Sequence, residues 1–176
     1  MIKTIVVPVD GSDHAKKAAG LAADIAEKYG ARLVFIHSLM RNTTAGEIKA
    51  LSDTIKIPDT LRAELDKLQE DAIEAVASAY DAAPISIPMP DKILREVAEV
   101  ILDDAKATAQ VKGVSDVDAK ILDGSPTDAI VAAAKGENAD MVVMGSRGLS
   151  NIGGLLMGSV SHKVSHLCDC TCVTVK

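Results

Sequence analysis

The sequence predicts an open, doubly wound α/β fold in which helices cover both faces of a five-stranded parallel sheet. Two observations lead to this prediction. Short apolar segments rich in β-branched residues alternate with longer segments in which apolar residues recur every three or four positions. Connections that contain a helix place consecutive strands parallel. We expect the Rossmann-like strand order 3-2-1-4-5, with ligands at the carboxyl ends of the strands where the order changes direction.

The first strand–helix–strand unit lies within residues 5–36. Ile5–Val9 is predicted as a strand, and the DGSD sequence after it as a turn that caps a helix. Gly30 fits the position just past the end of that helix, and Leu33–Ile36 is the next strand. The helix is indicated by residues at helical spacing: Ala18, Leu21, Ile25 and Tyr29.

Residues 40–90 interrupt this alternation. The RNTTAGE sequence (41–47) is typical of a loop, and the prolines of APISIPMPD (83–91) predict a second, extended loop. A helix over 59–80 is predicted by one apolar face, which consists of Leu61, Leu65, Leu68, Ala72, Val76 and Ala79. We treat residues 1–176 as one domain, in which this variable helical insertion is either a flap or ordinary padding of the core.

The alternation resumes at Asp91, where a helix with Leu94 and Val97 on one face begins. The alternating pattern of residues 117–122 is typical of a strand at the edge of a sheet. Ser125 as N-cap, followed by proline, starts a helix that runs to about residue 136. Met141–Met144 is predicted as a buried strand, and a helix follows from about Val160 to Leu167. Cys170–Val175 is the closing strand.

The composition limits the possible partners of this chain. The net charge is −6 and no block of Lys and Arg occurs, so we expect neither nucleic acid nor an anionic membrane as a partner. Aromatic residues make up only 2%, which leaves little material for stacking on bases. No apolar run reaches the roughly 18 residues of a membrane span, and the amino-terminal run is too short for a signal peptide. The three cysteines suit a reducing compartment, so we expect a cytoplasmic protein.

A glycine-rich stretch, GSRGLSNIGGLLMGSVS (145–161), follows the buried strand and leads into the last helix. Glycine allows backbone N–H groups to approach a phosphate without an intervening Cβ. The N-terminus of the helix after Gly158 adds unpaired N–H donors, and Ser159 and Ser161 add hydroxyl groups. The spacing matches neither the Walker A motif nor the dinucleotide fingerprint. The stretch therefore predicts a phosphate-binding loop of another kind, or else a mobile loop without a ligand.

The motif G-x2-G-x9-G-S, from Gly145 to Ser159, resembles the ATP-binding motif G-x2-G-x9-G-(S/T) of the universal stress protein family. The first strand and turn, VVPVDGS (6–12), and the strand-to-loop join, VVMGSRG (142–148), are also similar to that family. The resemblance covers about residues 1–38 and 91–176, and family members vary over 40–90. It implies bound ATP and a homodimer, commonly formed by antiparallel pairing of the last strand with its mate.

The resemblance also implies roles for individual residues. Asp10 would contact the adenosine with Pro8 beside it, and Met144 and Gly145 would line the adenine pocket. Arg147 offers a cation to the phosphates. The ribose and phosphates would be held by Gly148, Gly158, Ser159, Val160 and Ser161. From the residues alone, Asp10 is either a ligand of ribose or adenine or a turn and helix-capping residue.

Two positions depart from the family pattern. The second strand of family members usually ends in His-Val, whereas His37 is followed here by Ser38, so a small polar side chain replaces an apolar neighbour of the adenine. The last strand usually begins Cys-Pro-Val, whereas Cys170-Thr171-Cys172 stands here. Both changes can alter the pocket or the dimer edge, and neither removes a phosphate contact.

The sequence favours a protein that holds ATP over one that turns it over. Phosphoryl transfer needs a protein-held metal, a lysine or arginine and a positioned nucleophile. No acidic pair, base or catalytic lysine is evident beside the loop, so we expect no catalytic residues, and any Mg²⁺ or Mn²⁺ would be held by the phosphates. The hypothesis is a regulatory stress-response protein that signals to an unknown partner through nucleotide occupancy and dimerisation. The alternatives are a slow ATPase or kinase-like enzyme and an ATP-independent chaperone or adaptor.

Cysteine and histidine side chains offer one further candidate site. Cys168, Cys170 and Cys172 alternate, and His162 and His166 are one helical turn apart just upstream. This set could ligate a soft metal, although Cys-x-Cys is not the usual zinc spacing. Partly buried, reduced cysteines are the alternative that we favour, so we expect no metal site.

Overall fold

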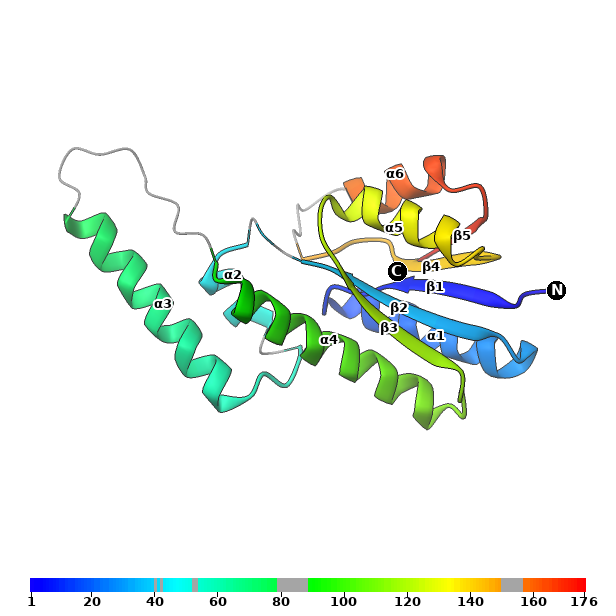
Figure 1. Cartoon of the computed structure of the whole chain (residues 1–176), viewed down its shortest axis with the longest axis horizontal. Coiled ribbons are helices and arrows are strands. Elements are labelled where there is room, and N and C mark those ends of the chain that lie inside the picture. Colours follow the sequence, from blue (N-terminus) through cyan, green and yellow to red (C-terminus); the bar gives the residue numbers. More distant parts are fainter. Residues whose placement is uncertain (40, 42, 52–53, 79–88, 150–156) are drawn as a thin grey trace.

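The structure is a computed structural model, and it describes residues 1–39, 41, 43–51, 54–78, 89–149 and 157–176. All five strands are parallel and form one sheet with the order β3-β2-β1-β4-β5 (Figure 1). This arrangement confirms the predicted fold class and strand order. The strands are β1 (Thr4–Pro8), β2 (Arg32–Ser38), β3 (Val117–Leu122), β4 (Met141–Gly145) and β5 (Thr171–Val175).

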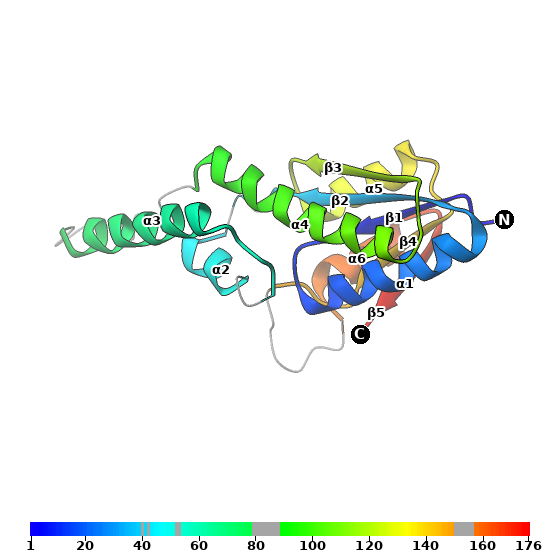
Figure 2. The same ribbon diagram turned by 90° about the horizontal axis from the view of Figure 1, so that it is seen from below.

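Helices cover both faces of the sheet, as predicted. They are α1 (Asp13–Tyr29), α2 (Ala45–Ala50), α3 (Asp59–Ser78), α4 (Asp91–Val111), α5 (Pro126–Gly136) and α6 (Ser159–Leu167). Helices α1 and α4 pack on one face, and α5 and α6 pack on the other (Figures 1 and 2). No helix among the described residues combines the length and the apolar character that crossing a bilayer would require.

Strand side chains alternate between two apolar clusters, because neighbouring residues of a strand point to opposite faces. Ile5, Val7, Leu33, Phe35 and Val143 join the cluster under α1 and α4. The α5–α6 face receives the intervening residues: Val6, Val34, Ile36, Val142 and Met144. The same alternation assigns the residues at the strand ends to one face of the sheet or the other.

Helix α1 begins where the sequence predicts. Ser12 is its N-cap, and the Ser12 hydroxyl accepts a hydrogen bond from Ala15 N at 3.3 Å. Gly30 ends it in the left-handed conformation, with φ 63°. The buried face of α1 consists of alanines, and small side chains allow this helix to lie close against β4 and α4: Ala15, Ala18, Ala19, Ala22, Ala23 and Ala26.

Two details of the predicted elements differ in the structure, and parts of two other predicted elements lie outside the described residues. Helix α2 occupies part of a segment predicted as loop, because Ile48 and Leu51 bury their side chains in the α1–α4 cluster. Ser125 is the N-cap of α5, but its side chain makes no capping hydrogen bond with a described residue. The last two residues of the helix predicted over 59–80, and most of the loop predicted over 83–91, lie outside the described residues.

The described part of the 40–90 insertion joins the core at one end and projects at the other. Leu61 and Leu65 of α3 are buried in the α1–α4 cluster. Farther along the same helix Ile73 is 62% exposed, and α3 extends beyond the sheet (Figure 1). Arg41 fastens the start of the insertion to the sheet edge, with ion pairs of 2.7 Å to Asp91 and 2.6 Å to Asp123. The base of the insertion is therefore core padding, and the outer part of α3 is a projection.

Candidate functional site

The predicted ligand residues of three strands lie on one face at one edge of the sheet. The register pairs Val6 with Val142 and Pro8 with Ile36, so the carboxyl ends of β1, β2 and β4 are aligned. Side chains two residues apart on a strand point to the same face of the sheet. Pro8, Ser38 and Met144 therefore lie on the α5–α6 face, each two residues after a member of the apolar cluster there: Val6, Ile36 and Val142. The structure therefore brings Pro8, Ser38 and Met144 together around one corner of the sheet.

Asp10 lies in the turn between β1 and α1, and its two carboxylate oxygens have different surroundings. Oδ1 accepts hydrogen bonds from Ser12 N at 3.0 Å and from Ser12 Oγ at 2.6 Å. Oδ2 lies against the glycine loop, since a Cβ placed on Gly148 would come within 2.5 Å of it. Asp10 is thus a turn residue that orders the helix cap, and it also lies directly beside the predicted phosphate loop.

Gly145 ends β4 where the strand meets the start of α1. A Cβ at this position would lie 2.8 Å from His14 Cβ and 2.9 Å from the His14 carbonyl carbon. Real Cβ atoms do not approach other atoms so closely, and backbone cannot yield cheaply. Glycine is needed here for close packing of the strand on the helix, because the backbone angle itself is ordinary.

The N-terminus of α6 is held against the end of β4 by two hydrogen bonds to Ser146 O. Gly158 N donates to Ser146 O at 2.7 Å. The buried Ser161 hydroxyl donates to Ser146 O at 2.9 Å and to Gly158 O at 3.0 Å. The predicted phosphate-binding hydroxyl of Ser161 is therefore already used to hold the loop and the helix together.

Among the described residues, backbone donors at the same helix end have no hydrogen-bond partner. Its first hydrogen bond within the helix runs from His162 N to Gly158 O, so the N–H groups of Ser159, Val160 and Ser161 precede the helical ladder. Among the described residues no side chain caps this helix, and no acidic residue lies in its first turn. Unpaired amides at a helix N-terminus attract anions.

Arg147 adds a cation to this edge. It is half-buried, and the structure gives it no ion pair with any residue that it describes. A guanidinium group that is not engaged by a carboxylate can bind phosphate oxygens through two parallel hydrogen bonds. The loop from Gly145 to Gly148 therefore combines close backbone approach with positive charge.

The end of β2 carries one ordered polar side chain on each face. Ser38 Oγ donates to Gly124 O at 3.0 Å, which attaches the loop after β3 to this corner. His37 faces the α1–α4 cluster, and its Nδ1 lies 2.8 Å from Val9 O. Burial lowers the pKa of His37, against the opposing effects of the Val9 hydrogen bond and of the Asp10 charge. His37 therefore supports the turn that carries Asp10 from the side away from the predicted ligand.

The cysteines pack as ordinary partly buried thiols. All three are free and lie against the α5–α6 cluster. Burial raises the pKa of Cys168 to about 12, so this thiol stays protonated at neutral pH. Within the described residues, no group of three or more His, Cys, Asp or Glu side chains is arranged to hold a metal ion. The rings of His162 and His166 contact each other edge-on at 4.7 Å.

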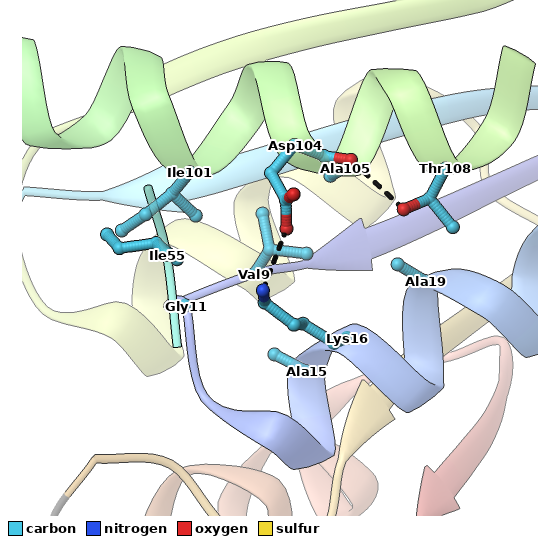
Figure 3. A pocket seen from close by; sticks show the side chains of 10 residues that line it. All are labelled: Val9, Gly11, Ala15, Lys16, Ala19, Ile55, Ile101, Asp104, Ala105 and Thr108. Atoms are coloured by element: carbon cyan, nitrogen blue, oxygen red, sulfur yellow. Dashed lines mark hydrogen bonds and ion pairs between the residues drawn. The ribbon is translucent and has the colours of Figure 1, made fainter. Parts of the chain in front are cut away.

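A small apolar pocket lies on the opposite face of the sheet from Pro8, Ser38 and Met144. It lies between α1 and α4 and is lined by side chains such as Ile55, Ile101 and Ala15. Figure 3 shows Lys16 and Asp104, which also line the pocket, pointing toward each other, and their ion pair measures 3.2 Å. The two charged groups pair with each other, and the remaining lining is mostly apolar. We therefore interpret the pocket as part of the packing of α1 against α4.

Sequence reasoning missed two residues that shape this site. Ser12 donates two hydrogen bonds to Asp10 and also caps α1. Ser146 connects the ends of β4, β5 and α6 through its backbone N and O. The capping role could be read from the DGSD turn. Ser146 could have been found by continuing the alternation of β4 from Val142 through Met144.

Comparisons with known proteins identify the family of this chain. The model of the universal stress protein family matches residues 1–176. The chain belongs to the universal stress protein family. A universal stress protein of Thermus aquaticus, described as lying in the QAH/OAS sulfhydrylase 3′ region, is 35% identical over 181 residues and is covered completely, as is this chain.

Two solved universal stress protein structures extend the comparison to ligands. One, in complex with cAMP, is 25% identical with a TM-score of 0.59, and the match covers 99% of this chain and 97% of that one. The other, from Archaeoglobus fulgidus in complex with dAMP, is 18% identical with a TM-score of 0.58, and the match covers 100% and 98%. At that lower identity the second comparison shows the shared fold alone.

The glycine contacts generate a first prediction. Gly145→Ala should lower the free energy of unfolding by about 1–3 kcal/mol, because its Cβ meets backbone atoms of α1. Gly158→Ala is the matched control. Its Cβ would lie 3.4 Å or more from its neighbours, so it should cost less than about 1 kcal/mol. Urea denaturation measures both, and equal losses would contradict the packing role of Gly145.

His37 generates a prediction about pH. Because its pKa is lowered in the folded protein, the unfolded chain binds a proton more readily. Stability should therefore be full above the ordinary histidine pKa of about 6.5 and should decline as the pH falls through that value toward the lower folded pKa. The Asp123 carboxyl, with a pKa of about 2, titrates well below this window.

The measurement is urea denaturation at pH 8, 6 and 5. His37→Asn keeps a donor for Val9 O and removes the titrating ring, so it should flatten the decline. If wild type and His37→Asn lose stability equally over this range, other groups cause the decline.

Proposed function

We propose that this chain is a regulatory protein of the stress response that binds ATP at the carboxyl edge of its sheet. The observation that carries the proposal is the uncapped N-terminus of α6, which is held beside the glycine loop. Free amides, a nearby guanidinium and close backbone approach together suit a polyphosphate. The cAMP-bound relative supports an adenine nucleotide as the ligand class.

The proposed site divides into two parts. Pro8, Ser38, Met144 and Gly145 line the adenine side, and Asp10 Oδ2 accepts a hydrogen bond from the adenosine. The ribose and the phosphates meet the loop and the helix end, through Arg147, Gly148, Gly158, Ser159, Val160 and Ser161. Ser161 contributes its amide, because its hydroxyl is engaged within the protein. Any Mg²⁺ or Mn²⁺ would be held by the phosphates.

The described residues favour holding ATP over hydrolysing it. Around this edge the charged side chains given above are Asp10, Arg147, Arg41, Asp91 and Asp123, and the last two are already engaged in ion pairs with Arg41. Asp10 is engaged by Ser12 through one oxygen. A positioned base and a protein-held metal, which phosphoryl transfer enzymes use, have no counterpart among these groups.

Nucleotide occupancy would be communicated through the carboxy-terminal strand. In the sheet β5 has β4 as its only described neighbour, so its outer edge can pair with a second copy. Ser146 N donates to Val175 O at 2.7 Å, which connects that strand directly to the loop. We propose a cytoplasmic homodimer formed through β5, whose regulatory protein partner is still to be identified.

Native mass spectrometry of the purified protein tests the ligand and the assembly together. We expect particles of two chains with ATP retained, and release of ATP on mild denaturation. Protein that is free of nucleotide and also fails to bind added ATP would overturn the proposal in favour of an ATP-independent chaperone or adaptor. A steady-state turnover above about 1 s⁻¹ would favour an ATPase or kinase instead.

A substitution in the loop tests the phosphate site. Gly158→Val should abolish ATP binding, because the proposal places a phosphate beside Gly158 and the larger side chain would compete for that space. Helix content should stay unchanged, because φ at Gly158 is −74°, which any residue can adopt. Gly20→Val is the matched control, since no atom lies within 4 Å of the new Cβ on α1. Isothermal titration calorimetry gives affinity, and circular dichroism gives helix content. An unchanged affinity in Gly158→Val would refute the proposed phosphate site.

A further inference from the structure

Two buried side-chain polar atoms of the described residues have no hydrogen-bond partner, namely His37 Nε2 and Ser146 Oγ. Ser146 is 1% exposed, so bulk water does not satisfy its hydroxyl. Leaving a buried donor unpaired costs about 1–3 kcal/mol, and native proteins keep few such groups. The hydroxyl of Ser146 therefore points to a partner that binds to the folded chain.

The strand pattern places this hydroxyl on the ligand face. Val142 and Met144 join the α5–α6 cluster, whereas Val143 joins the other one. The missing Cβ of Gly145 faces His14 on α1. Ser146 is next in the alternation, so its side chain returns to the face of Met144. His37 belongs to the opposite face, which separates the two unpaired groups.

Backbone hydrogen bonds hold Ser146 beside the N-terminus of α6. Its N–H donates to Val175 O, and its carbonyl accepts from Gly158 N, both at 2.7 Å. The same carbonyl accepts from Ser161 Oγ at 2.9 Å. With the backbone fixed in this way, the hydroxyl can change position only by rotation of χ1 between staggered positions.

We propose that the Ser146 hydroxyl donates a hydrogen bond to a phosphate oxygen of the bound nucleotide. The inference rests on the proposed function and adds a contact that the glycine motif does not contain. A phosphate is the part of the ligand expected here, because Gly158 and the free amides of α6 directly adjoin the Ser146 carbonyl. A hydroxyl that donates to a charged oxygen forms a short, strong hydrogen bond. This bond would offset the cost of burying the hydroxyl unpaired in the free protein.

Ser146→Ala tests this contact. Without nucleotide its melting temperature should equal or exceed that of the wild type, because alanine removes an unpaired buried hydroxyl. Its dissociation constant for ATP should rise about tenfold or more, since a hydrogen bond to a charged group is lost. Adenosine, which has no phosphate, should bind both proteins equally. Ser146→Thr keeps the hydroxyl and should bind ATP within about threefold of the wild type.

Ser165→Ala is the matched control. This exposed serine of α6 donates to Ser161 O at 2.8 Å, and its loss should leave ATP affinity unchanged. Ser146→Cys, which nearly preserves volume but donates weakly, replaces Ser146→Ala if the alanine variant does not fold.

Three results would overturn the inference. They are an unchanged ATP affinity in Ser146→Ala, an equal loss for adenosine and ATP, and a lower melting temperature without a change in affinity. Failure of the proposed function is distinct from these, because then the wild-type chain would not bind ATP. If Gly158→Val abolishes binding while Ser146→Ala binds normally, the proposed phosphate site is supported and only the serine contact is rejected.

Discussion

The hydrogen bond from Gly158 N to Ser146 O joins two segments on which the site depends. It brings the N-terminus of α6 to the end of β4. The Ser161 hydroxyl strengthens the same junction from within the helix. This junction places the first amides of α6 beside the end of β4.

The two faces of the sheet have separate tasks. The α1–α4 face carries the base of the insertion and the larger apolar cluster, which includes residues such as Phe35, Ile48 and Leu65. The α5–α6 face carries a smaller cluster and the predicted ligand residues of the strands. The buried residues of the insertion, Ile48 and Leu65, lie on the face opposite the predicted ligand residues, and Arg41 connects the start of the insertion to Asp123 beside them.

Much of this arrangement follows from sequence patterns, and some does not. Periodicity and the DGSD turn predicted the strands, most of the helices and the start of α1, because these depend on neighbours within a few residues. Helix α2 was missed, since its buried Ile48 is understood only against the rest of the core. The engagement of the Ser161 hydroxyl was also missed, because it depends on a carbonyl 15 residues away. The segment 150–156, inside the motif, lies outside the described residues.

The unequal surroundings of the Asp10 carboxylate have a consequence for selectivity. Ser12 engages Oδ1 with two donors and so fixes the direction in which Oδ2 points. A carboxylate oxygen only accepts hydrogen bonds, so the ligand atom that meets Oδ2 must carry a proton. A carbonyl or a bare ring nitrogen in that place would be repelled. Under the proposed binding mode, this small turn after the first strand would discriminate among nucleobases and sugars by the position of their hydrogens.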